Sequence, residues 1–407
     1  MKQINGGVTA AKGFNAQGGH VGIKADDIKD MALIVSEVPA NCAAAFTTNV
    51  VKAASVQRNI EVMKKQPKIC GIAVNSGNAN ACTGEEGKAS NLVMAETLAA
   101  QIGCDTNQVL TASTGVIGVQ PDPAVYESGI KELFPKICGC EKAAENAAWG
   151  ILTTDTHPKQ IAVEIEIGGK TVTIGAMAKG TGMICPNMAT MLAFVTTDCC
   201  ISAGMLDKAL KATIGTTYNM VSVDGDTSTN DSIFLLANGL AENAEITAEG
   251  PDYETFKDAL YFVNEYLAKE LVRDGEGATK FIETEVINAA SEDKARAIAK
   301  SVIKSSLLKA AIFGSDANWG RVLCAMGYSG EDFDPEKVDV TFRSAKGELE
   351  VLKEGTPIVF DEDKALEILG EDDITIIADL KEGAASGKAW GCDLTYEYVK
   401  INGEYRS

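Results

Sequence analysis

Strand-like and helix-like hydrophobic patterns alternate along all 407 residues, and this alternation constrains the fold more than any other feature. Residues 69–75 form a short apolar run, and after a glycine-rich loop Leu92, Leu98 and Ile102 recur at helical spacing before Gly103. Such a chain buries its apolar faces by layering helices on sheets. We therefore predict an α/β or α+β layered sandwich rather than an all-α or all-β fold.

Further patterns predict individual elements. Alternating residues on both sides of Gly168-Gly169 predict a hairpin with a two-residue turn. Apolar residues at helical spacing predict one helix over 256–271 and another from Ala295 to Leu307. The C-terminal third adds strand candidates at 338–342, 374–378 and 394–399. We expect a smaller C-terminal α/β domain, with the spatial boundary within 240–285.

The charge balance narrows the classes of partner. The chain carries 37 Lys and Arg against 57 Asp and Glu, a formal net charge of −20. Nonspecific nucleic-acid binding needs clustered cations, so we expect no nucleic-acid partner. No apolar stretch approaches the roughly 18 residues of a membrane helix, and the N-terminus lacks a signal-peptide pattern. We expect a cytoplasmic protein with no membrane partner.

The metal-binding residue types are sparse or irregularly spaced. Histidine occurs only at positions 20 and 157, and the 11 cysteines lack the spacing of a zinc site, so we read the cysteines as buried, reduced thiols. The carboxylates from Asp224 to Asp231 do not match a calcium loop and favour a polar turn or a structural network near the site. We assign no metal.

The segment KGTGMICPNMATMLAF, residues 179–194, changes from a turn-forming stretch to a strand-like run at Ala189-Thr190. If a strained turn held the Thr190 hydroxyl against the Ala189 carbonyl, the peptide bond could pass through an ester that water cleaves. Thr190 would then supply both a nucleophilic hydroxyl and an α-amine base with a pKa of about 8. The alternative is an ordinary turn. The scarcity of histidine disfavours a Ser-His-Asp triad.

This segment resembles the self-cleavage signature of the ornithine acetyltransferase (glutamate N-acetyltransferase) family of arginine biosynthesis. The resemblance spans the chain through AVNSGNANACTG, STGVIG, TTDTHPK, VDGDTSTND, GEGATK, GSDANWGR and the terminal INGEYRS. It implies an N-terminal-nucleophile-like, self-processing fold. It also implies a cut between Ala189 and Thr190 into an α chain, 1–189, and a β chain, 190–407, with two copies of each in the assembly.

The resemblance also implies residue roles. Thr190 would be the nucleophile, and Thr114 with Gly115 would form the oxyanion hole. The substrate-binding positions that match the family are Thr153, Lys179, Thr190, Glu276, Asn402 and Ser407. On chemical grounds we expect Lys179 to bind a carboxylate and Glu276 to bind an ammonium group. The alternative for either charge is a solvated surface position, and Ser407 requires the tail to fold back into the site.

The activity implied by this family is transfer of acetyl from N-acetylornithine to glutamate through an acetyl-Thr190 intermediate. Acetyl-CoA is a possible second acetyl donor, and no bound cofactor is expected. Two alternatives stay open at this point: a self-cleaving aminopeptidase, which would release free acid, and a non-catalytic amino-acid-binding protein, which would remain uncut.

Overall fold

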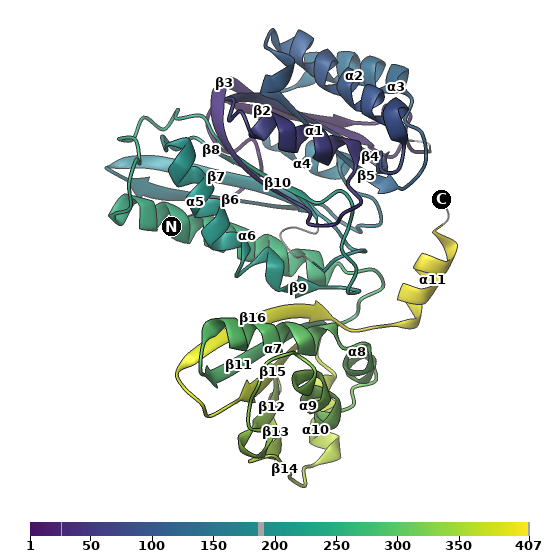
Figure 1. The fold of residues 1–407 in the computed structure, drawn as a ribbon, viewed down its shortest axis with the longest axis vertical. Coiled ribbons are helices and arrows are strands. Elements are labelled where there is room, and N and C mark those ends of the chain that lie inside the picture. The colour runs from purple at the N-terminus through teal and green to yellow at the C-terminus, as the bar shows by residue number, and fades with distance from the viewer. Residues whose placement is uncertain (26, 186–190, 406–407) are drawn as a thin grey trace.

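A computed structural model describes residues 1–25, 27–185 and 191–405, and these residues form two sheets with helices on their outer faces (Figure 1). The first sheet has nine strands in the described part of the chain. In spatial order they are β1 (Lys2–Ile4), β6 (Lys159–Ile167), β7 (Lys170–Lys179), β8 (Leu192–Thr197), β10 (Ser232–Ala237), β3 (Met31–Phe46), β4 (Ile69–Asn78) and β5 (Val109–Val116), with β2 (Phe14–Gly19) also on β3.

The long strand β3 divides this sheet into two halves. Its register against β4 shifts between Val35 and Ala40, next to Pro39, which cannot donate a ladder hydrogen bond. The first part of β3 pairs with β2 and β4, and its last part pairs with β10. One apolar cluster joins inward side chains of both halves, including Ile34, Val74 and Phe234, so the two halves pack against each other as a sandwich.

The helices of this sandwich are α1 (Ala54–Met63), α2 (Gly84–Ile102), α3 (Pro123–Leu133), α4 (Glu141–Gly150), α5 (Ala203–Ile214) and α6 (Pro251–Arg273). Helices α2, α3, α5 and α6 cover the outer faces of this sandwich, whereas α4 and the end of α1 add side chains to the cluster between its halves. Helices α2 and α3 bury Leu98 and Ile130 against the half that contains β4. Helices α5 and α6 bury Leu206 and Phe256 against the half that contains β6 and β7.

The second sheet lies below α6 in Figure 1 and is built mainly from residues after 280. Its strands, in spatial order, are β14 (Thr356–Pro357), β13 (Gly347–Lys353), β12 (Asp339–Ser344), β15 (Asp373–Asp379), β11 (Phe281–Ala289), β16 (Ala385–Cys392) and β9 (Val221–Ser222). The remaining helices are α7 (Glu292–Lys304), α8 (Ser306–Phe313), α9 (Trp319–Gly327), α10 (Glu362–Leu369) and α11 (Tyr396–Glu404). Among the helices described, none has the length and apolar character to cross a bilayer.

The layered α/β prediction is confirmed, and so are several elements. Strands β6 and β7 form the predicted hairpin, and Gly168 and Gly169 both take positive φ values of 56° and 75°, as its two-residue turn requires. Helix α2 ends at Gly103, which has a left-handed φ of 82°. The strand β4 extends to Asn78, three residues further than the apolar run suggested.

Two predicted elements are wrong. Residues 394–399 do not form a strand: Thr395 accepts a hydrogen bond from the Tyr398 amide and starts α11, and β16 takes the place beside β11. The predicted helix from Ala295 to Leu307 ends at Lys304. Ser305 caps the next helix, α8, and the Leu307 side chain is exposed. In both cases a hydroxyl cap overrode the hydrophobic pattern.

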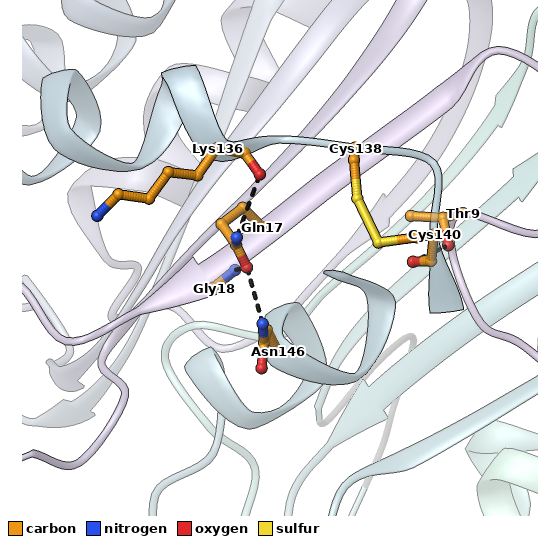
Figure 2. The surroundings of a disulfide bond; sticks show 7 residues. All are labelled: Thr9, Gln17, Gly18, Lys136, Cys138, Cys140 and Asn146. Carbon is orange, nitrogen blue, oxygen red and sulfur yellow. Dashed lines mark hydrogen bonds between the residues drawn. A yellow bond between two sulfur atoms is a disulfide. The ribbon is translucent and has the colours of Figure 1, made fainter. Parts of the chain in front are cut away.

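The expectation that all cysteines are buried, reduced thiols is also wrong. A disulfide joins Cys138 and Cys140, whose Cα atoms are 5.5 Å apart (Figure 2). The backbone of Cys138 exchanges two hydrogen bonds with Ala16, and the Cys140 carbonyl accepts one from the Thr9 hydroxyl at 3.1 Å. The disulfide thus lies in a turn anchored on β2, and two other cysteines, Cys82 and Cys324, are exposed.

Candidate active site

A cavity of about 180 Å³ lies where loops of the first sheet meet the C-terminal part of the chain. Thr114 and Gly115 reach it from the end of β5, and Lys179 is the last residue of β7. The other predicted residues come from the α4–β6 loop, the α6–β11 loop and helix α11; they are Thr153, Glu276 and Asn402. The cavity therefore collects six predicted positions from segments that are far apart in sequence.

Lys179 is buried, with a relative exposure of 6%, and its ammonium group points at hydroxyl groups of two predicted residues. Its Nζ lies 2.8 Å from Thr153 Oγ1 and 3.3 Å from Thr114 Oγ1. Asp155 Oδ2 lies 3.7 Å from the same Nζ. Burial lowers the pKa of Lys179, and the negative charge of Asp155 opposes that shift. The surface-charge alternative for Lys179 is thereby excluded.

Glu276 is held by polar groups on both carboxylate oxygens. Thr154 Oγ1 donates to Oε1 at 2.7 Å, and Asn402 Nδ2 donates to Oε2 at 2.7 Å. The Glu276 amide donates to the Thr181 carbonyl at 3.0 Å, which fixes the loop. Its carboxylate therefore faces the cavity with a defined orientation and carries a charge available to a ligand cation.

The end of β5 brings two backbones unusually close. Gly115 has a φ of 128°, and a Cβ on it would lie 2.4 Å from the carbonyl carbon of Gly77 on β4. Only glycine fits such a contact. Residues 113–116 of the STGVIG motif thus belong to the end of a strand, and they present the Thr114 side chain and the Gly115 backbone to the cavity.

Three predicted positions lie outside the described residues: Ala189, Thr190 and Ser407. The described neighbours Ile184, Met191 and Leu192 line the cavity. The Met191 carbonyl accepts a hydrogen bond from the Ser232 amide at 2.9 Å, so Met191 is tied to the beginning of the parallel pair β8 and β10. Met191 therefore lies in the cavity wall immediately before β8.

Comparisons with known proteins identify the family of the chain. The sequence pattern of the ArgJ family matches residues 15–407. The chain belongs to the ArgJ family. It is 49% identical to the arginine biosynthesis bifunctional protein ArgJ of Caldanaerobacter subterraneus subsp. tengcongensis over all of both chains. It is 45% identical to the Bacillus subtilis protein of the same name, over all of this chain and 98% of that one.

A solved relative supports the fold. The crystal structure of the arginine biosynthesis bifunctional protein argJ from Bacillus halodurans is 49% identical, with a TM-score of 0.51, over 53% of this chain and all of that chain. The family resemblance read from the motifs is confirmed, and so is an acetyltransferase of arginine biosynthesis. The ArgJ family favours this activity over the aminopeptidase and binding-protein alternatives.

Sequence reasoning missed several residues of the cavity in this ArgJ-family chain. They are Thr154, Asp224, Asp231, Tyr398 and Tyr405, together with Asp155 behind Lys179. Four of these six residues lie in the motifs TTDTHPK and VDGDTSTND, which the sequence analysis had already singled out. The sequence around each motif does not show which of its side chains face the cavity. The expectation of a structural polar network at 224–231 fits Asp224, which accepts from the amides of Met183 and Ile184.

Asp231 is the most unusual acid in the cavity wall. It is 2% exposed, and its Oδ2 has no hydrogen-bond partner in the described part of the chain. Burial raises the pKa of this carboxyl well above its usual range, although a Ser228 hydrogen bond and the Lys179 charge act against the shift. Across the described residues, no group of three or more His, Cys, Asp or Glu side chains could hold a metal ion.

Proposed function

We propose that this chain is a self-processed acetyltransferase whose nucleophile is Thr190. Cleavage of the Ala189–Thr190 bond by water leaves a carboxylate on Ala189 and a free α-amine on Thr190. The Thr190 hydroxyl then attacks the acetyl carbonyl of N-acetylornithine, its proton passes through the α-amine to the departing amine, and ornithine leaves. The glutamate amine attacks the acetyl ester and restores the hydroxyl.

The observation that carries this proposal is the single cavity reached by Thr114, Thr153, Lys179, Glu276 and Asn402. The first and last of these positions are 288 residues apart in the sequence. The five residues share no local sequence pattern. They bring the Glu276 carboxylate, the Lys179 ammonium group and threonine hydroxyls together in a cavity that Met191 also lines. An acyl-transfer site needs such convergent polar groups.

The charges of the cavity match the proposed substrates. The Lys179 ammonium would bind the α-carboxylate of N-acetylornithine or glutamate, and Glu276 would bind the side-chain ammonium of ornithine. Thr153 and Asn402 already contact these two groups and would hold them in place. Ser407 would add a contact from the tail.

Thr114 and Gly115 would stabilise the oxyanion formed in each attack. Gly115 packs directly on Gly77 and has no side chain. No side chain at this position therefore blocks an oxygen from reaching both the Thr114 hydroxyl and the Gly115 backbone N–H. Moving an acetyl group between two similar amines changes bond energies little, so the site has to lower a barrier and needs no energy source.

The solved relative is consistent with a cut near the middle of the sequence. All of its chain aligns with only 53% of this one, as expected if it is one of two products of a single precursor. We further propose that two α and two β chains assemble, that acetyl-CoA can replace N-acetylornithine as acetyl donor, and that no cofactor stays bound.

Intact mass spectrometry of the purified protein tests the proposal. We expect two fragments, with the second beginning Thr190-Met-Leu, and an acetyl adduct on that fragment after exposure to N-acetylornithine. The Thr190→Ala variant should remain one chain and transfer no acetyl. A wild-type chain that stays uncut yet transfers acetyl at full rate would contradict the proposal. Turnover of acetyl-CoA with glutamate tests the second donor.

A further inference from the structure

We propose that Asp155 is the positioning residue that fixes Lys179 and thereby sets the affinity of the site for substrate carboxylates. This inference rests on the proposed function and deepens it, because none of the predicted roles involves Asp155. The residue does not line the cavity; it lies behind Lys179 and acts through that side chain.

The Asp155 side chain is fully buried, and its carboxylate is held by backbone amides from two segments. Its Oδ1 accepts from the Gly180 amide at 2.8 Å, and its Oδ2 accepts from the Thr153 amide at 3.2 Å. Lys179 Nζ lies 3.7 Å from Oδ2. One carboxylate thus ties together the backbone on both sides of the ammonium group, so it controls the position as well as the charge of Lys179.

Asp155 belongs to a buried row of alternating charges. Lys159 Nζ lies 2.8 Å from Asp155 Oδ1 and 2.5 Å from Asp274 Oδ2, and the Lys159 and Asp155 side chains are both 0% exposed. The row runs from Lys179 at the cavity through Asp155 and Lys159 to Asp274 at the end of α6. It contains two cations and two anions, so its formal charges cancel.

The balance of positive and negative charges in this row explains why Lys179 can stay charged in the cavity wall. An unpaired buried ammonium group loses its hydration and tends to lose its proton. Lys159 repels the Lys179 charge, whereas Asp155 provides the strongest attraction, ahead of Glu276 and Asp231. The charges of Lys179 and Lys159 in turn hold the pKa of Asp155 below its usual range, although burial acts to raise it.

A positioned ammonium group matters most for a carboxylate ligand. Thr153 and Thr114 accept hydrogen bonds from Lys179 and direct it along the cavity wall, and Asp155 anchors it from behind. Without Asp155, Lys179 would lose charge or turn toward Glu276 or Asp231, the two other carboxylates that attract it. A ligand without a carboxylate would be insensitive to this change.

The test is the Asp155→Asn variant, assayed for acetyl transfer from N-acetylornithine to glutamate. We expect KM for both substrates to rise about tenfold or more with a smaller change in kcat, as for a loss of binding that is equal in ground and transition states. The rise should increase with pH as Lys179 deprotonates more easily. For the α-carboxamide of N-acetylornithine, wild type and variant should have the same KM.

A second variant keeps the buried charges balanced. Asp155→Asn with Lys159→Gln removes one charge of each sign, so it should fold even if the single variant does not, and it should show the same rise in KM. Asp198→Asn is the matched control, because Asp198 is fully buried and accepts backbone hydrogen bonds from Lys12 and Thr173 away from the cavity. Its KM values should not change.

The outcomes distinguish a failure of the proposed acetyltransferase function from a failure of the proposed role of Asp155. A wild-type protein that transfers no acetyl would contradict the proposed function itself. Active wild type with unchanged KM in the Asp155 variants would overturn the positioning role. Equal losses for the carboxylate and carboxamide substrates, or failure of both variants to fold, would show that Asp155 serves only the fold and would also overturn it.

Discussion

At the scale of residues, the cavity depends on groups whose chemistry is set by their neighbours. Lys179 and Glu276 are ordinary charged residues in sequence, yet each is held by two or more polar groups at hydrogen-bond distance. Thr114 combines a contact to Lys179 with a position at the end of β5. Substitutions here should change catalysis more than stability.

Thr114→Ala tests this distinction. The variant should lower kcat by about 10²-fold, because one oxyanion donor is lost. The melting temperature should change little, because Thr114 is only partly buried and the strand pairing of β5 is kept. Steady-state kinetics and a thermal melt on the same preparation give both values. Full activity in this variant would contradict the oxyanion role.

Lys24 provides a prediction for pH. Burial and the nearby Lys179 charge lower the pKa of Lys24 to about 8. Between about pH 8 and 10.5 the folded chain loses this proton before the unfolded chain does, so the free energy of unfolding rises with pH relative to Lys24→Met. Below about pH 8 and above about pH 10.5, the difference in the free energy of unfolding between the two proteins should not change with pH. Denaturant unfolding of both proteins from pH 7 to 11 measures it, and a difference that falls over this window would refute the assignment.

At the scale of elements, helix α11 connects the tail to the cavity without joining a core. None of its described residues is buried, and its Tyr396 side chain is 85% exposed. Its contacts with the body include Thr395 Oγ1 to the Gly277 carbonyl and Asn402 to Glu276. Figure 1 shows α11 standing apart from both sheets. The helix therefore serves the site more than the fold.

Deletion of residues 396–407 should separate these two roles. Because little apolar surface is lost, the free energy of unfolding should fall by only about 1 kcal/mol, which lowers the melting temperature by roughly 1 °C in a chain of this size. KM for N-acetylornithine should rise at least about tenfold, since Glu276 loses a charged hydrogen bond. Asn402→Ala should reproduce part of that rise. A large loss of stability with unchanged KM would contradict this reading of α11.

At the scale of the whole molecule, the proposed α and β chains share one sheet. Strands β8 and β10 come from residues after 190, and they lie between β7 and β3, which come from residues before the cut. The β8–β7 and β10–β3 ladders each contain six residue pairs. Neither chain can complete its core alone.

We therefore expect the cut protein to behave as one folding unit. It should run as two bands on a denaturing gel, elute as one species in native buffer, and unfold in a single thermal transition. Residues 190–407 expressed alone should be insoluble or unfolded, whereas the uncut Thr190→Ala protein should elute like the wild type. Chains that separate on dilution in native buffer would contradict this interleaving.

Sequence patterns succeeded where the determining contacts are local. The hairpin at Gly168-Gly169 and the end of α2 at Gly103 depend on residues within a few positions. The patterns failed at Leu394–Val399, because alternating apolar residues do not show whether a strand partner exists, and β16 already occupied that place. The Cys138–Cys140 disulfide was missed because only the fold shows how β2 anchors that turn.

The sequence by itself determined the layered α/β class, the family, and the identity of the residues to examine, because propensity, periodicity and motifs are encoded by residues close together in the chain. Only the tertiary structure decided that Thr114, Thr153, Lys179, Glu276 and Asn402 line one cavity, and that Asp155 stands behind Lys179. The physical reason is that the charge state and orientation of a buried group depend on neighbours brought together by packing, and packing is a property of the whole chain.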